Sequence, residues 1–166
     1  MGVSEDLEQV ALQERELRLP RLDAQMAWEL GTLLRNMAEE RELPVVIDVR
    51  RFGQPMFYAA MDGSTPDNPE WVRRKSNVVA RFHRSSYGVG LSLKEKNDSL
   101  EGRGLPVADY AAHGGSFPLV VEGAGIVGSV TVSGLPQRAD HELVVEALCM
   151  LLRREYEVLR LKPELQ

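Results

Sequence analysis

The sequence predicts an α+β domain in which helices pack on an antiparallel sheet. Two pairs of β-rich segments, 45–51 with 55–61 and 119–121 with 126–132, are each joined by a short turn that contains glycine. Such turns are typical of hairpins. Segments with helical periodicity flank and separate the two pairs, and no regular β-α-β repeat is present. Hairpins that alternate with helices favour an antiparallel sheet over a doubly wound parallel one.

Length and composition predict a single domain over residues 1–166. The chain is 43% hydrophobic and 27% charged, which is ordinary for a globular protein with a sizeable core. No apolar run approaches the ~20 residues of a membrane span, and the N-terminus lacks the order of a signal peptide. We therefore expect a cytoplasmic protein with no membrane partner. The net charge of −5 argues against a nucleic-acid partner.

The first half of the chain predicts three helices. Residues 4–14 have acidic residues in the first turn and a short apolar side. Asp23 is a suitable N-cap for a helix that runs to about residue 42. Asn68 and Pro69 open a basic helix over 69–84. Between the first two helices, the alternating segment 16–20 indicates a short strand.

The second half of the chain is less regular. Residues 87–93 are compatible with a strand or an extended turn, and 94–101 with a short helix. Asp140 is expected to cap the last helix, over 140–160. Gly128 lies inside the strand 126–132, which indicates a bulge or a close approach of another backbone. Cys149, the one cysteine, excludes an internal disulfide and is expected to be a buried, inert thiol.

The basic helix carries a lysine in an unexpected position. No acidic residue lies between Glu70 and Glu95, so this region is locally positive. At about 100° per residue, Lys75 falls near the middle of the apolar face. A lysine there must snorkel, pair with a carboxylate or line a cavity. Snorkelling or a slightly different helix register is the structural alternative, whereas the functional interpretation is a cationic wall for an anionic ligand.

The segment 81–87 adds further candidate site residues. Its donors for a carboxylate or phosphate are Arg81, Arg84, Ser85 and Ser86. His83, in the same segment, can bind a metal or transfer a proton. A simple helix exit is the alternative for the whole segment.

The three histidines, His83, His113 and His141, show no helical metal-binding spacing. A metal site made of all three would need distant segments to converge, whereas haem needs a single axial imidazole. His113 alternatively reads as a loop residue, and His141 as part of a first helical turn. The GxGxxG pattern at 123–128 lies in a hairpin, so no nicotinamide or flavin is expected.

Four stretches carry a family resemblance over nearly the whole chain. They are WVRRKSN at 71–77, RFHRSSY at 81–87, DYAAHGGSFP at 109–118 and VTVSGLPQRADHELVVEA at 130–147. With them, the sequence resembles the GlcG/HbpS-like family of haem-degrading or haem-binding domain proteins, and more closely its stand-alone cytosolic branch. The resemblance implies a profilin-like antiparallel sheet of about five strands with helices on both faces. It also implies a homo-oligomer, a dimer or larger.

The resemblance also implies haem as a cofactor, and slow haem breakdown in some relatives. Transferred to this chain, His83 and His113 are the candidate iron ligands. The cations Lys75, Arg81 and Arg84 could hold the propionates. The flat segment Gly114–Gly115 could approach a ring or an anion closely.

Two functional hypotheses follow, and the sequence does not decide whether the protein is an enzyme. The first is an oligomeric haem- or small-ligand-binding protein with weak haem-degrading activity. The second is a non-enzymatic oligomeric module or scaffold that binds a small anionic metabolite. No nucleophile–base pair can be recognised, so no catalytic residue is assigned.

Overall fold

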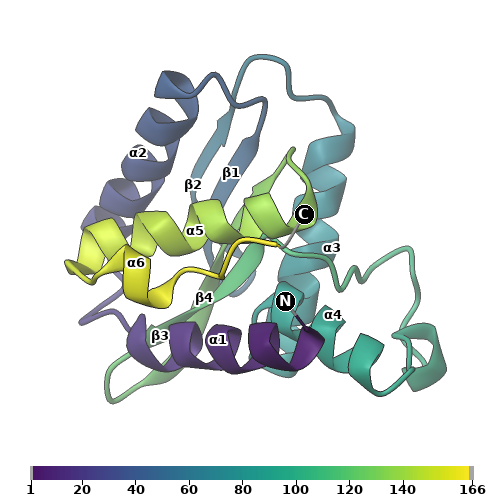
Figure 1. Cartoon of the computed structure of the whole chain (residues 1–166). Helices are drawn as coiled ribbons and strands as arrows, with labels where there is room; N and C mark the ends of the chain where they lie inside the picture. Colours follow the sequence, from purple (N-terminus) through teal and green to yellow (C-terminus); the bar gives the residue numbers. More distant parts are fainter. Residues whose placement is uncertain (1, 165–166) are drawn as a thin grey trace.

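The computed structural model describes residues 2–164 and has a four-stranded antiparallel sheet of order β2-β1-β4-β3 (Figure 1). The strands are β1 (Val46–Arg51), β2 (Gln54–Ala60), β3 (Ser116–Val121) and β4 (Gly125–Ser133). Both predicted hairpins are confirmed, and they join through antiparallel pairing of β1 with β4. The α+β class is therefore confirmed, whereas the expected number of about five strands is wrong.

Helices pack on the sheet and around its β3 edge (Figure 1). They are α1 (Val3–Glu16), α2 (Ala24–Glu40), α3 (Asp67–Phe82), α4 (Ser86–Glu95), α5 (Gln137–Leu152), α6 (Tyr156–Leu159) and the 3-10 turn η1 (Glu101–Arg103). Helices α2 and α5 pack on one face, and α3 packs against β4, β3 and β1. In the part of the chain that the structure describes, no helix is both long and apolar enough to cross a membrane.

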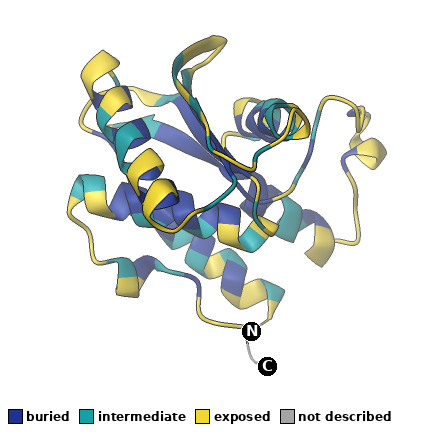
Figure 2. Cartoon of the chain, turned by 90° about the horizontal axis from the view of Figure 1, so that it is seen from above, coloured by how far each residue is buried: buried dark blue, intermediate teal, exposed yellow. Residues whose placement is uncertain are grey.

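The two faces of the sheet differ in polarity. Ile47 and Val130 point into the apolar core under α2 and α5. Because side chains alternate along a strand, the opposite face presents Asp48, Ser129 and Thr131, which are all buried. Figure 2 shows the buried residues concentrated in the sheet and on the inward sides of the helices. The polar face lies on the side of α3, the helix that carries Lys75.

Gly128 confirms the predicted close approach of a second backbone. A Cβ atom at this position would lie 2.0 Å from the carbonyl oxygen of Arg50 in β1. The register of β3 with β4 also shifts next to it, between Leu119 and Val120. Only glycine lets β1 and β4 pair closely here.

Segment 16–20 does not form the predicted strand, because only one of its residues pairs. Leu19 makes a single parallel bridge to Val121. Its N–H donates to the Val120 carbonyl, and its carbonyl accepts from the Glu122 N–H. Pro20 has no N–H, so the ladder cannot continue beyond this bridge.

The prediction for 87–93 is wrong, because these residues belong to helix α4. Ser85 is the N-cap, and its Oγ accepts from the backbone N–H three residues later. Gly90 lets the helix pack closely, since a Cβ there would lie 2.2 Å from the carbonyl oxygen of Ala112. The short helix predicted over 94–101 is also wrong, because α4 ends at Glu95 and only η1 follows.

The predicted final helix begins earlier than expected and is interrupted. Helix α5 starts at Gln137, so Asp140 lies inside its first turn and is not the N-cap. Arg153 ends α5 in a left-handed conformation with φ 55°, and α6 follows as a separate turn. The prediction of one helix over 140–160 is therefore wrong. Cys149 is buried as expected, and burial raises the pKa of its thiol to about 11.

Helix α1 closes the domain over a buried histidine. His141 has no exposed surface, and its Nε2 lies 2.7 Å from Gln13 Oε1. The Gln13 amide NH₂ donates to the Leu159 carbonyl and to Glu142, so its Oε1 must accept from His141 Nε2–H. His141 Nδ1 then has no hydrogen-bond partner within residues 2–164. Burial lowers the pKa of His141 to about 3, helped by the charge of Arg138.

This histidine makes the fold acid-sensitive. In the unfolded chain His141 titrates near 6.5, so its contribution to stability is complete above about pH 6.5 and is lost as the pH falls toward 3. Between pH 6.5 and pH 4 the free energy of unfolding should fall by about 3 kcal/mol from this group. In urea titrations at several pH values, His141→Gln should lack that component. The exposed His83→Asn should keep it, and equal pH slopes in wild type and His141→Gln would contradict the assignment.

Candidate functional site

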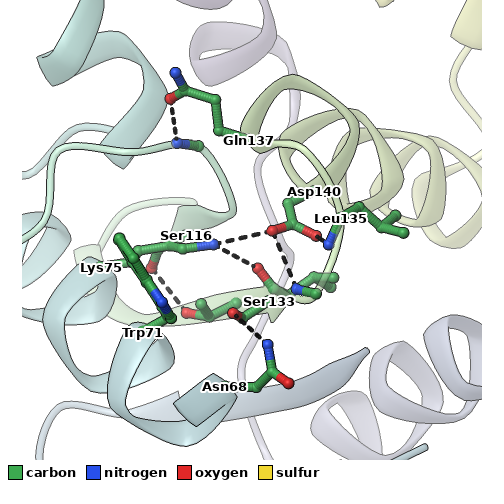
Figure 3. A network of polar contacts seen from close by, with 12 residues as sticks. Asn68, Trp71, Lys75, Ser116, Ser133, Leu135, Gln137 and Asp140 are labelled. Atoms are coloured by element: carbon green, nitrogen blue, oxygen red, sulfur yellow. Dashed lines mark hydrogen bonds and ion pairs between the residues drawn. The ribbon is translucent and has the colours of Figure 1, made fainter. Parts of the chain in front are cut away.

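A pocket of about 290 Å³ opens where α3, the start of α5 and the segments flanking β3 and β4 meet. Its volume is at the lower end of the range for small-molecule sites. Helix α3 contributes Asn68, Trp71 and Lys75, and other segments contribute His113, Ser133, Gln137 and Asp140. Figure 3 shows Lys75, Asp140, Ser133 and Asn68 in polar contacts at the pocket, whereas Gln137 stands apart and turns its amide to a backbone N–H. The pocket lies on the α3 side of the sheet, the side of its polar face.

The floor of the pocket is a buried ion pair between Lys75 and Asp140. Lys75 Nζ lies 3.1 Å from Asp140 Oδ2 and 3.1 Å from the Val132 carbonyl oxygen (Figure 3). The two side chains are only 4% and 2% exposed. The predicted alternatives for Lys75 are therefore resolved: it does not snorkel, and it both pairs with a carboxylate and lines a cavity.

Asp140 is held by backbone donors as well as by the lysine. Its Oδ1 accepts from the Leu135 N–H at 2.9 Å, and its Oδ2 accepts from the Gly134 N–H at 3.3 Å. Burial lowers the pKa of Lys75, and the attraction of Asp140 opposes that effect. Burial also raises the pKa of Asp140, against the attraction of Lys75 and the backbone donors. The ionised pair has no net charge, so the pocket floor is polar rather than cationic.

The predicted glycines Gly114 and Gly115 lie directly behind the pocket. At Gly115, with φ 137°, a Cβ atom would lie 2.3 Å from the Val132 carbonyl oxygen and 2.6 Å from Lys75 Nζ. At Gly114 a Cβ would lie 2.2 Å from the Gln137 carbonyl oxygen. Any side chain here would displace the ion pair or the start of α5, so the two glycines allow the pocket to form.

His113 stands at the mouth of this pocket. Its exposed ring meets Trp71 edge-on, with the ring centroids 5.3 Å apart. Loss of water around the ring lowers the pKa of His113, and the charges of Lys75 and Arg74 lower it further. Arg74 lies over the Trp71 ring, 4.7 Å from its centroid. The imidazole is therefore neutral at pH 7, and it makes no hydrogen bond with any residue in 2–164.

The structure does not bring His83 to His113. His83 ends α3 in a left-handed conformation, is exposed, and stacks on Phe52 with the ring centroids 6.2 Å apart. It follows Trp71 by twelve residues, which is about 18 Å along a helix. Within residues 2–164 no group of three or more His, Cys, Asp or Glu side chains could hold a metal ion. His83 and His113 therefore belong to different regions of the surface.

The other predicted residues of segment 81–87 make contacts outside the pocket. Arg84 donates to Ser92 Oγ at 3.0 Å. Ser85 caps α4, and Ser86 Oγ accepts from the Ser116 N–H at 3.0 Å. Arg81 is exposed near the C-terminal end of α3. The ligand role of these four residues stays a prediction, and their observed contacts are those of a folded helix junction.

Sequence reasoning about individual residues missed much of the pocket, including Trp71, Ser133, Gln137 and Asp140. These residues all lie in the stretches that carried the family resemblance, which was the available signal. Asn68 lies outside those stretches and was considered only as the start of a helix. No local pattern could show that these segments share a cavity.

A comparison with protein families matches residues 22–149 to a model described as "Haem degrading protein HbpS-like". A UPF0303 protein of Acidobacterium capsulatum is 60% identical over 162 residues, covering 97% of this chain and 98% of that protein. A UPF0303 protein of Burkholderia thailandensis is 59% identical over the same length and with the same coverage. The chain is thus similar to these proteins over nearly its whole length.

Solved structures show the same fold. The crystal structure of the Ybr137w protein superposes with a TM-score of 0.81 at 30% identity, covering 89% of this chain and 88% of that chain. A PduOC:heme complex gives a TM-score of 0.66 at 16% identity, covering 77% and 93%. HbpS gives 0.63 at 18% identity, covering 81% and 92%. The family match over residues 22–149, which is more than half of the chain, shows that the chain belongs to the HbpS-like family.

Proposed function

We propose that this protein binds haem and that His113 is the iron ligand, at the mouth of the pocket above Lys75 and Asp140. The observation that carries the proposal is the neutral, exposed imidazole with no hydrogen bond in the described part of the chain. Neutral imidazole is the common protein ligand of haem iron. The family description names haem, and one protein of the same fold forms a complex with it.

The residues of the site fit one face of a haem. His113 supplies a single axial nitrogen, and Trp71 supplies an aromatic wall beside it. Lys75 and Gln137 carry donors that suit propionate oxygens. When bound, haem supplies an iron centre for redox or oxygen chemistry, and the role of the chain is to hold and orient it.

Several finer properties remain proposals. A pocket of about 290 Å³ encloses only part of so large a ligand. The homo-oligomer expected from the resemblance would let a second copy cover the exposed part. Haem degradation, which the family description names, would be tested by bilin production from the bound complex. The alternative, a binding module for a small anion, rests on the hydrogen-bond donors of the same pocket.

A haemin titration followed by visible absorbance tests the assignment of His113. Wild type should show a saturable one-to-one Soret shift, and His113→Ala should weaken binding about tenfold or more, because the axial bond is lost. His83→Asn is the matched control, since it removes the other exposed imidazole and asparagine tolerates the left-handed conformation. Loss of the shift in His83→Asn with retention in His113→Ala would contradict the proposal, as would a non-saturable shift in every protein.

The pH dependence of haem binding should follow the lowered pKa of His113. Protonation of the imidazole competes with iron, so affinity should stay constant as the pH falls to about 6.5 and should decrease only below it. Arg74→Gln removes a positive charge that lowers this pKa, so the decrease should then begin at a higher pH. Soret titrations at successive pH values measure both midpoints. An unchanged midpoint in Arg74→Gln would show that the titrating group is not His113.

A further inference from the structure

The orientations of the two amide side chains in the pocket are fixed by backbone donors. Asn68 Oδ1 accepts from the Thr65 N–H at 2.9 Å, so its NH₂ group faces Ser133 Oγ, 3.4 Å away. Gln137 Oε1 accepts from the Gly114 N–H at 3.0 Å. A backbone N–H can only donate, so both amides present their NH₂ groups as donors. Gln137 is exposed at the rim of the pocket, and its NH₂ group has no hydrogen-bond partner among the residues that the structure describes.

The acceptors around the pocket floor are already engaged. Both oxygens of Asp140 accept hydrogen bonds, from Lys75 Nζ and from the N–H groups of Gly134 and Leu135. The Val132 carbonyl also accepts from Lys75. Ser133 Oγ accepts from the Asn68 amide, which leaves its hydroxyl hydrogen available. The side chains that line the floor therefore offer hydrogens and few free lone pairs.

Lys75 is the strongest of these donors. An ammonium group has three N–H donors, and two of them are used, on Asp140 and on Val132. The third has no partner within residues 2–164, although the side chain is only 4% exposed and lines the pocket. A buried N–H without an acceptor destabilises the folded protein. The third N–H of Lys75 therefore requires an acceptor oxygen from water or from a ligand.

The ligand group that matches this lining accepts several hydrogen bonds, donates none and carries a single negative charge. The donors of Lys75 and Ser133 suit the two oxygens of a carboxylate, and the exposed Gln137 adds a donor at the rim. Because Asp140 already neutralises Lys75, a dianionic phosphate would meet no net positive charge on the floor. The charge of Arg74 beside Trp71 adds attraction for an anion at the mouth.

We infer that the pocket floor is a binding site for the carboxylate of a small organic acid, held by Lys75 and Ser133, with the exposed Gln137 at its rim. The inference rests on the proposed function only in placing the ligand in the same pocket. The carboxylate has two sources: a propionate of haem, or a separate compact acid. The experiment below distinguishes them.

The first arm uses colourless probes without haem. Benzoate, and acetate as a smaller probe, are titrated into the protein while the amide signals of residues 113–116 and the Trp71 indole signal are followed by NMR. Saturable shifts are expected with at least one of the two carboxylates. Benzyl alcohol, which keeps the ring but lacks the carboxylate, should give none. Failure of both carboxylates to saturate, or equal binding of benzyl alcohol, overturns the inference.

The variant chosen is Gln137→Glu, because it keeps the acceptor for the Gly114 N–H and replaces the free NH₂ group by an anionic oxygen. An acidic residue in the first turn of a helix is also compatible with folding. Carboxylate affinity should fall about tenfold or more, and Ser133→Ala should weaken it less. Gln54→Glu is the matched control, since it makes the same charge change at an exposed position of β2. Equal loss in Gln54→Glu and Gln137→Glu would overturn the assignment.

The second arm compares haemin with its dimethyl ester. If a propionate occupies the floor, Gln137→Glu weakens haemin binding more than ester binding. If a separate acid occupies it, benzoate or acetate binds and the variant affects haemin and the ester equally. Carboxylate binding without any saturable haemin shift would refute haem binding and leave the carboxylate site standing. A haemin shift that depends on His113, without carboxylate binding, would support haem binding and refute the carboxylate site.

Discussion

The buried ion pair of Lys75 and Asp140 is the constraint on which the site depends. Burying either charge alone would cost about 3–5 kcal/mol, so each requires the other and a full set of hydrogen bonds. The surrounding chain supplies them: the Val132 carbonyl accepts from the lysine, and two backbone N–H groups donate to the aspartate. Glycine is the only residue type that fits at position 115, against this pair. One interaction therefore positions α3, β4 and the start of α5 relative to one another.

The sequence predicted those parts of the fold that depend on local patterns. The two hairpins and the Asp23 cap, whose side chain accepts from the Met26 N–H, form from residues close in sequence. Residues 87–93 were predicted as a strand or an extended turn, whereas they form α4, in which Gly90 is required by contact with Ala112, far along the chain. The strand expected at 16–20 alternates correctly, but only tertiary pairing decides that a single bridge forms.

The site was predicted only in part, for a related reason. Helical periodicity identified Lys75 as anomalous, since a charge on an apolar face is visible from sequence alone. Its partner Asp140 was interpreted as a helix cap, because a separation of 65 positions in the sequence hides the contact. The sequence offered His83 and His113 equally as iron ligands. Only the structure shows that they lie in different regions of the surface, His83 at the end of α3 and His113 beside Trp71. The orientation of Gln137, which decides the chemistry of the pocket, depends on a hydrogen bond to Gly114 that no local pattern predicts.

The residues that cover His141 lie outside the span that the family model matches. The family match ends before Leu159 and begins after Gln13, yet these two residues meet over the buried imidazole. Removal of the residues outside 22–149 would take away both of these contacts and would expose the histidine to water. An exposed imidazole keeps a pKa near 6.5, so this histidine would no longer lower the stability of the domain as the pH falls. Helix α1 and the C-terminal turn therefore determine how strongly the stability of this domain depends on pH.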